Sequence, residues 1–141
     1  MEQKQKFQLK LKTYKKAVTG LSKSLDIDLS KYDEVVRDAI KNGRIQKFEY
    51  CTEMTWKLIK KYLYIYHNID TKSPTLTIKE FFNIDMIEHV TLENLLRMIE
   101  MRNRLSHEYR EEYFEEIHNQ LGEFLILMES VNELITNNIN S

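Results

Sequence analysis

Four side chains that could carry out chemistry lie close together in one stretch of the chain: Arg102, Asn103, His107 and Tyr109. An arginine guanidinium binds phosphate through paired hydrogen bonds, and a histidine of ordinary pKa, about 6.5, exchanges protons near neutral pH. Together they could act on a phosphodiester. On a helix, Asn103 and His107, four residues apart, share a face, whereas Arg102 and His107 diverge by about 140°. Arg102 must therefore reach around the helix, or the pair must meet across an interface.

The stretch also resembles a known signature. Arg, a polar residue, three variable residues and His mark HEPN domains, a superfamily of small helical proteins associated with nucleotides and RNA, and Arg102, Asn103 and His107 match this pattern. With Tyr109, the stretch is similar to the Arg-x4-His-x-Tyr pattern of HepT-type toxins and of the related nucleotidyltransferase substrate-binding family.

Two upstream segments extend the resemblance. The segment 44–50, together with Glu53, Trp56 and Lys57, resembles the helix that the nucleotidyltransferase substrate-binding family carries at this distance before the motif. Ser73-Pro74 resembles the start of that family's next helix. The likeness covers most of the chain, and it implies a helical bundle that forms homodimers, which would bring two Arg/His sets together.

The resemblance implies two functions. In the first, the chain is a non-catalytic, substrate-binding partner of a small, separately encoded nucleotidyltransferase in a two-component, toxin-antitoxin-like system. The chain has no Gly-Ser plus Asp-x-Asp constellation of its own to hold metal and nucleotide. In the second, it is a metal-independent endoribonuclease toxin, in which His107 acts as general acid and base, Arg102 stabilises the phosphorane charge and Asn103 orients the site. The segment 44–57 favours the first.

Tyr109 connects these two hypotheses. In HepT-type pairs the matching tyrosine is the residue to which the partner nucleotidyltransferase attaches AMP, and the resemblance carries that role to Tyr109 by motif position. An ordinary hydrogen bond at a bend of the chain is the alternative role. For Arg102 and His107 the alternative is to satisfy free carbonyls at a helix C-terminus.

Composition predicts a single helical domain over residues 1–141. The chain is 42% hydrophobic and 30% charged, with three glycines and one proline, so hairpin turns are few and an all-α fold is favoured. Its longest apolar run, 124–128, is far shorter than the ~20 residues of a membrane helix. The lone Cys51 offers neither a disulfide nor a metal cluster; we expect a small buried thiol, no cofactor, no metal and no membrane partner, in a cytoplasmic protein.

The net charge of −1 hides an asymmetry between the two halves. Residues 1–79 hold 17 Lys and Arg against 9 Asp and Glu, whereas residues 80–141 hold 4 against 13. The simplest explanation is a basic first helix beside an acidic last helix, joined by exposed ion pairs that each contribute about 0 to 1 kcal/mol. An RNA- or nucleotide-binding surface on the lysine-rich face is the alternative.

Apolar spacing predicts an up-and-down bundle of four long helices plus short helices. We expect a break or kink at Gly43, an N-cap at Ser73 before Pro74, and a helix that Thr91 caps and that carries the Arg/His motif. After a bend near 108–111, one final helix should run through Ile135. The predicted helices span 7–25, 32–42, 45–66, 74–82, 91–107 and 113–135.

Overall fold

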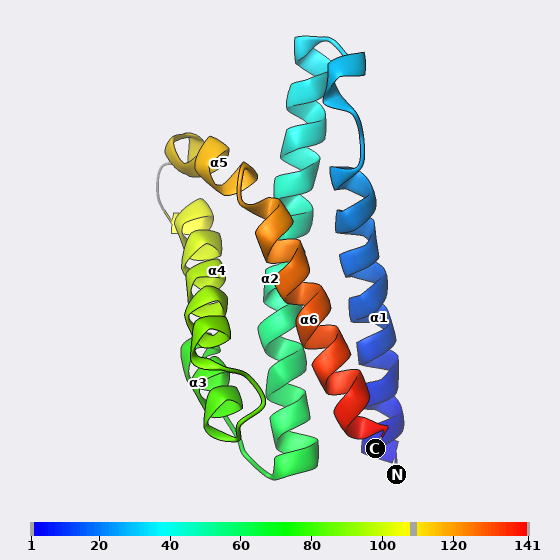
Figure 1. Ribbon diagram of the computed structural model, residues 1–141, viewed down its shortest axis with the longest axis vertical. Helices are drawn as coiled ribbons and strands as arrows, with labels where there is room; N and C mark the ends of the chain where they lie inside the picture. The colour runs from blue at the N-terminus through cyan, green and yellow to red at the C-terminus, as the bar shows by residue number, and fades with distance from the viewer. Residues whose placement is uncertain (1, 108–109, 141) are drawn as a thin grey trace.

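The computed structural model describes residues 2–107 and 110–140, and every regular element in that part of the chain is helical (Figure 1). Four helices are long and two α-helices and one 3-10 helix are short, which confirms the predicted all-α bundle. The long helices are α1 (Glu2–Leu25), α2 (Glu34–His67), α4 (His89–His107) and α6 (Leu121–Ile139), and the short elements are η1 (Leu29–Lys31), α3 (Pro74–Asn83) and α5 (Arg110–His118).

The core lies where α1, α2 and α6 meet. The apolar stripe of α1 is buried at the predicted spacing, from Phe7 to Leu21. It packs on α2, where Phe48 stacks on Phe124 of α6 with ring centroids 5.2 Å apart. At the centre, the fully buried Tyr14 hydroxyl shares a 2.8 Å hydrogen bond with Thr55 and lies 3.3 Å from the Met128 carbonyl oxygen. Burial of each large side chain contributes about 1.5–3 kcal/mol, so this seam fixes the three helices.

Helix α2 is one continuous helix of 34 residues, so the predicted break at Gly43 is wrong. Gly43 has no positive φ, and the helix continues because Ile45 and Phe48, directly after it, are fully buried in the core. That burial outweighs the roughly 1 kcal/mol that glycine costs inside a helix. The left-handed end of α2 is instead Asn68, with φ 55°, whose N–H donates to the Leu63 carbonyl oxygen.

The start of α3 agrees with the sequence prediction, whereas the start of α4 does not. Ser73 caps α3 as predicted, since its hydroxyl accepts a hydrogen bond from the Leu76 N–H, with Pro74 in the first turn. Thr91 does not cap α4, because the helix begins two residues earlier, at His89. The imidazole of His89 lies 3.2 Å from the Glu93 carboxylate one turn on. α4 thus reaches His107 with the motif in its last turns.

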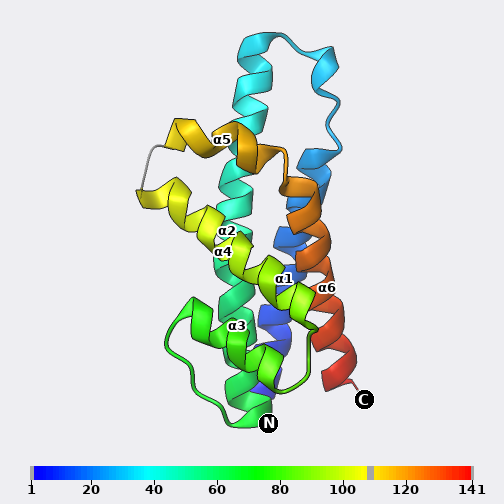
Figure 2. The ribbon, with the colours of Figure 1, turned by 60° about the vertical axis from the view of Figure 1, so that its left-hand side comes forward.

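The predicted final helix is two helices, α5 and α6, separated at Asn119 and Gln120. The last turn of α5 tightens there, because the Gln120 N–H donates to the Ile117 carbonyl oxygen three residues back. Ile117, Leu121 and Phe124 are all buried and keep helical spacing across the break, which hides it in the sequence. The break lets α5 cross α2 near Lys41 and lie over the end of α4, while α6 runs along α1 and α2 (Figure 2).

The connection between α1 and α2 projects beyond the rest of the bundle (Figures 1 and 2). None of residues 26–39 is buried, but local hydrogen bonds define the course of the backbone. Asp28 accepts hydrogen bonds from the N–H and hydroxyl of Ser30, and Asp33 caps α2 through the Val36 N–H. Residues 26–39, which we call the hairpin tip, are therefore ordered by local caps rather than by core packing.

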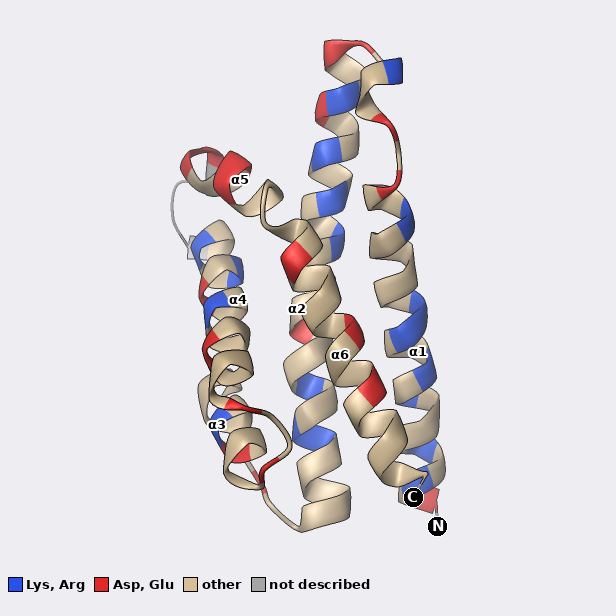
Figure 3. Ribbon diagram, viewed as in Figure 1, with Lys and Arg blue, Asp and Glu red and all other residues tan. Residues whose placement is uncertain are grey.

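The charge asymmetry maps onto the fold only in part (Figure 3). The basic α1 does lie beside α6, as predicted. Within the described residues, however, no ion pair joins the two helices. The basic and acidic halves of the chain are instead joined near the hairpin tip by an ion pair between Lys41 of α2 and Glu115 of α5, 3.2 Å apart. Acidic side chains gather on α5 (Figure 3), and the lysines of α1 are exposed to solvent. No described helix is both long enough and apolar enough to cross a membrane.

Candidate functional site

Helix α4 carries the motif along the seam that it forms with α2. Five apolar side chains anchor this helix: Leu95, Met98, Ile99, Met101 and Leu105. Because α4 buries residues on both sides of Arg102, the arginine side chain leaves the helix beside α2, and 27% of it is exposed. The guanidinium is therefore held near the surface rather than in solvent.

Arg102 is engaged by two neighbours. Its Nε lies 3.6 Å from Oε2 of Glu53 on α2, and its Nη1 donates a hydrogen bond to the Ser106 hydroxyl. Nε itself is covered and makes no hydrogen bond within the described residues. Glu53 also lies 3.6 Å from the ammonium of Lys57, one helical turn further along α2. One carboxylate thus stands between two cations.

This arrangement sets what Arg102 can do chemically. A phosphate that approached the guanidinium would have to compete with the Glu53 carboxylate, which already offsets its charge. Lys57, which is 59% exposed at its side chain, would be the second cation at the same place. The cluster of Arg102, Glu53 and Lys57 can therefore receive an anion only by displacing or sharing its own carboxylate.

The other predicted site residues are not gathered around Arg102 in the described part of the chain. Asn103 is exposed on α4, and no hydrogen bond joins it to the guanidinium. His107 is the last residue of α4, but its side chain lies outside what the structure describes, and so does Tyr109. The catalytic set of Arg102, Asn103 and His107 and the modification site Tyr109 therefore stay predictions.

The upstream segment that resembled the family helix has a structural centre at Arg44. This side chain is only 5% exposed, and it donates from Nε to the Ser24 carbonyl oxygen and from Nη2 to the Ile27 carbonyl oxygen, both at 2.9 Å. Burial lowers the pKa of its guanidinium from the ordinary value. Arg44 thus ties the end of α1 and the start of the hairpin tip to α2. Trp56 of the same segment is half-buried against the core.

His118 completes the contacts of Arg44. Its Nε2 lies 3.3 Å from Arg44 Nη1, and its ring stacks on Phe114 of the same helix, α5. Burial, followed by the charges of Arg44 and Lys41, lowers the pKa of the imidazole, while Glu115 opposes the shift. The neutral ring therefore accepts from the guanidinium. This role holds α5 to α2 and differs from a catalytic one.

Cys51 is buried, as predicted, and burial raises the pKa of its thiol to about 11. The thiolate, which is the nucleophilic form, is therefore scarce at neutral pH. In the ranges 2–107 and 110–140, no three His, Cys, Asp or Glu side chains cluster in a way that could hold a metal ion.

The sequence reasoning missed the contact between Glu53 and Arg102 and the depth of Arg44. The only signal in the sequence was the spacing of four residues between Glu53 and Lys57. No local pattern links Glu53 to Arg102, which lies 49 positions further along the chain. Arg104 was not singled out either. It pairs with Glu100 at 3.0 Å and lies over the Tyr113 ring at 5.1 Å, joining the end of α4 to α5.

Comparison with known proteins places these features in context. No curated protein matches the chain. A crystal structure of a protein from Thermus thermophilus is similar in fold, with a TM-score of 0.74 and 24% sequence identity, and the match covers 86% of this chain and 98% of that one. Residues 9–137 match the family described as nucleotidyltransferase substrate binding protein like. The chain, with its α2–α4 seam and buried Arg44, belongs to this nucleotidyltransferase substrate-binding family.

Proposed function

We propose that this chain is the substrate-binding partner subunit of a small, separately encoded nucleotidyltransferase in a two-component, toxin-antitoxin-like system. Family membership over residues 9–137 supports the link to nucleotidyl transfer. The observation that carries the non-catalytic role is the pairing of Arg102 with Glu53 at 3.6 Å. A guanidinium offset by its own carboxylate is suited to fixing α4 against α2, and less suited to stabilising new negative charge on a phosphate.

A homodimer is part of this proposal. Helix α2 presents a stripe on which Tyr50, Lys57 and Tyr64 follow one another at intervals of seven residues, with Tyr50 58% and Tyr64 48% exposed. Such residues stay on one face of a helix, and amphipathic tyrosines are common where two proteins meet. Glu53 beside Lys57 gives the stripe both charges, so a second copy in the antiparallel direction would be complementary to it.

Light scattering tests the dimer. At micromolar concentration we expect twice the chain mass of 17.0 kDa, and the Tyr50→Asp, Tyr64→Asp double variant should shift the protein toward the monomer. Tyr32→Asp, a matched change of a tyrosine in the hairpin tip, should leave the mass unchanged. A wild-type protein that scatters as a monomer throughout would contradict the dimer and any cooperation between two Arg/His sets.

The proposal expects a nucleotidyltransferase to be encoded in a neighbouring reading frame, and that protein is the one with which the partner role is tested. The two purified proteins should form a stable complex at micromolar concentration, detected by size-exclusion chromatography and calorimetry. Incubation with ATP and Mg²⁺ should then add AMP to Tyr109, mapped by mass spectrometry, and Tyr109→Phe should remain unmodified. If the proteins bind and Tyr109 stays bare, the acceptor is elsewhere. If they do not bind at all, the partner role fails.

The second candidate function is a metal-independent endoribonuclease. The observation that favours it is that Arg102, although paired, keeps 27% of its side chain exposed in the same helix end that carries Asn103 and His107. In this reaction the RNA 2′-hydroxyl attacks the adjacent phosphorus, the 5′-oxygen leaves, and His107 moves the protons. AMP on Tyr109 would silence the activity by occupying the donors of Arg102.

RNA cleavage by the purified protein separates the two functions. If the chain is a ribonuclease, His107→Ala should abolish cleavage, Arg102→Ala should slow it by about 100- to 1,000-fold, and a chelator should change nothing. Arg104→Ala, which removes a nearby arginine that contacts Glu100 and Tyr113, is the matched control and should retain cleavage. An inactive wild type leaves the partner subunit as the function.

A further inference from the structure

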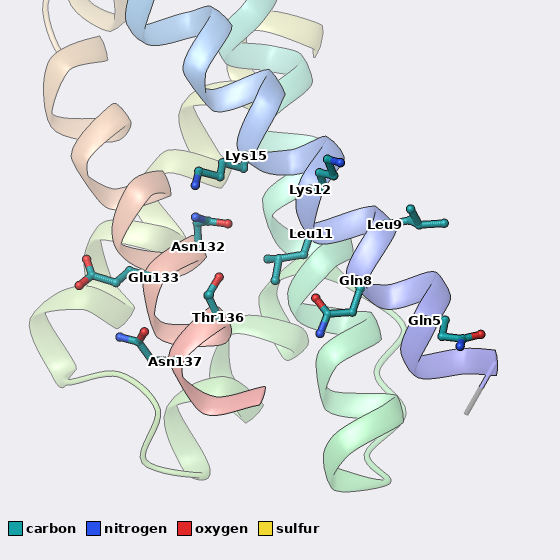
Figure 4. A pocket seen from close by; sticks show the side chains of 10 residues that line it. All are labelled: Gln5, Gln8, Leu9, Leu11, Lys12, Lys15, Asn132, Glu133, Thr136 and Asn137. Atoms are coloured by element: carbon teal, nitrogen blue, oxygen red, sulfur yellow. The ribbon is translucent and has the colours of Figure 1, made fainter. Parts of the chain in front are cut away.

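A polar cleft lies between the first half of α1 and the last half of α6, at the end of the bundle where the two termini meet (Figures 1 and 4). Its volume is about 760 Å³, within the range of small-molecule sites. Four of its lining side chains are carboxamides, and they are joined by a hydroxyl, two ammonium groups and a carboxylate. The lining residues are Gln5, Gln8, Leu9, Leu11, Lys12, Lys15, Asn132, Glu133, Thr136 and Asn137.

Five of these side chains converge on the space between the helices. Figure 4 shows Gln8, Leu11 and Lys15 directed from α1 toward α6, with Asn132 and Thr136 directed toward them from α6. Leu11 is only 6% exposed and forms an apolar floor. The cleft thus combines an apolar base with polar groups of both hydrogen-bonding kinds, which is the usual composition of a ligand site.

Asn132 is the most unusual of the five. Its Oδ1 is covered from solvent and accepts no hydrogen bond from any described residue. A buried acceptor without a donor costs about 1–3 kcal/mol, so native proteins rarely keep one without a reason. A ligand that carries an N–H donor would remove this cost. Asn132 is one of the residues that line the cleft, and Figure 4 shows its amide oxygen on the side that faces α1, so a change in the side-chain rotamer of Asn132 would bring Oδ1 into the cleft.

The charge of the cleft favours an anion. Lys12 and Lys15 are exposed and form no ion pair within the described residues. Glu133 is the one carboxylate among the lining residues, and its side chain points away from α1 (Figure 4). An ammonium group directed into the cleft, with no carboxylate facing it, is a point of attachment for phosphate.

We propose that this cleft binds an adenine nucleotide. A carboxamide offers an acceptor and a donor side by side, which pair with the N6 amino group and N7 of adenine. Asn132, with its unused Oδ1, would read that edge, Leu11 would contact the face of the base, and Lys15 would bind the phosphate. The inference rests on the proposed function, because it names the substrate class that a substrate-binding subunit would present to its nucleotidyltransferase.

The cleft is separate from the Arg102 cluster. It is built by residues 5–15 and 132–137, near the chain termini, whereas α4 ends with the motif beside α5, toward the opposite end of the bundle (Figure 1). Nucleotide held in the cleft would therefore be bound without contact to Arg102. Variants of the two sites can be tested independently.

Calorimetry on the full chain alone, with AMP, adenosine and inorganic phosphate as separate probes, tests the proposal. We expect AMP to bind, and Asn132→Leu to weaken AMP and adenosine alike by at least about tenfold. Lys15→Gln should weaken AMP by a similar factor and leave adenosine unchanged. Lys16→Gln, an exposed lysine outside the cleft lining, is the matched control. Amide NMR shifts upon AMP addition should centre on Gln8, Leu11 and Thr136.

Several outcomes would overturn the inference. They are the absence of AMP binding at millimolar concentration, binding that Asn132→Leu leaves intact, phosphate binding as tightly as AMP, and NMR shifts centred on the end of α4. Because no nucleotidyltransferase is present, the assay does not depend on complex formation. If the chain binds AMP but forms no complex with the nucleotidyltransferase, the nucleotide site is supported and the partner role is overturned. If it forms the complex but does not bind AMP, the partner role is supported and the nucleotide site is overturned.

Discussion

Arg44→Met should destabilise the protein more than any surface substitution on α2. The guanidinium donates to the Ser24 and Ile27 carbonyl oxygens at 2.9 Å and meets His118 at 3.3 Å. Methionine keeps the apolar stem as far as the position of arginine Nε but can donate to neither carbonyl. The change therefore isolates the polar contacts of a side chain that is 95% buried, since its exposed fraction is 5%.

The magnitude follows from these contacts. A hydrogen bond from a charged donor contributes about 1.5–3 kcal/mol, so the two carbonyl bonds together contribute about 3–6 kcal/mol. Part of this is returned because the variant no longer buries a charged group. We expect a net loss of about 2–4 kcal/mol in the free energy of unfolding, which is a fall of roughly 6–12 °C in melting temperature for a chain of this size. Arg44→Lys, which can satisfy one carbonyl, should lose about half as much.

Urea denaturation followed by circular dichroism measures the effect. The matched control is Arg37→Met, an exposed arginine two turns earlier on the same helix, which should change the free energy of unfolding by less than about 0.5 kcal/mol. If Arg44→Met is no more destabilising than Arg37→Met, the buried guanidinium does not hold α1 to α2, and the reasoning about this contact is refuted.

Three further predictions concern single side chains. The pKa of His118 is lowered in the folded protein, so the unfolded state binds its proton first as the pH falls. Stability should therefore decrease as the pH drops from about 7 toward the lowered pKa. In melting experiments at a series of pH values, His118→Gln should flatten this slope. Tyr14→Phe removes the hydroxyl bonded to Thr55 and should cost about 1–2 kcal/mol in urea denaturation, whereas Tyr32→Phe, at an exposed position in the hairpin tip, should cost almost nothing; equal losses would contradict the buried hydrogen bond. Gly43→Ala should stabilise by about 0.5–1 kcal/mol, because a Cβ there meets no atom within 4 Å, and a loss of stability would mean that α2 does bend at this position.

Much of the fold was predictable because the apolar spacing is regular. The α1 stripe from Phe7 to Leu21 and the Ser73 cap were confirmed, since both depend on local chemistry. Two of the wrong predictions, the break at Gly43 and the single final helix, have a common cause. Gly43 favours a break that long-range burial of Ile45 overrides, and the stripe from Ile117 to Phe124 conceals a break that tertiary packing imposes. Helix continuity at both places is decided by contacts distant in sequence.

The candidate site was predictable in its residue types and not in its contacts. The motif located Arg102 on the last turns of a helix, and the ion pair of Glu53 with Lys57 agrees with their spacing of four residues on one helix. The pairing of Glu53 with Arg102 arises only when α2 and α4 meet, so no local pattern could reveal it. The buried Asn132 acceptor is hidden for the same reason, because asparagine at that position looks like any polar residue on an exposed helix face.

The projecting hairpin tip has a consequence for cooperativity. With no buried residue from 26 to 39, this segment shares little of the hydrophobic free energy that binds the rest of the bundle into one unfolding unit. Arg44 stands at the boundary, with its hydrogen bonds to Ser24 and Ile27. Amide hydrogens of residues 34–39 should therefore exchange through a sub-global opening of lower free energy, while those around Phe48 exchange only upon global unfolding. A single arginine thus separates a locally melting end of α2 from a helix centre that unfolds only with the whole bundle.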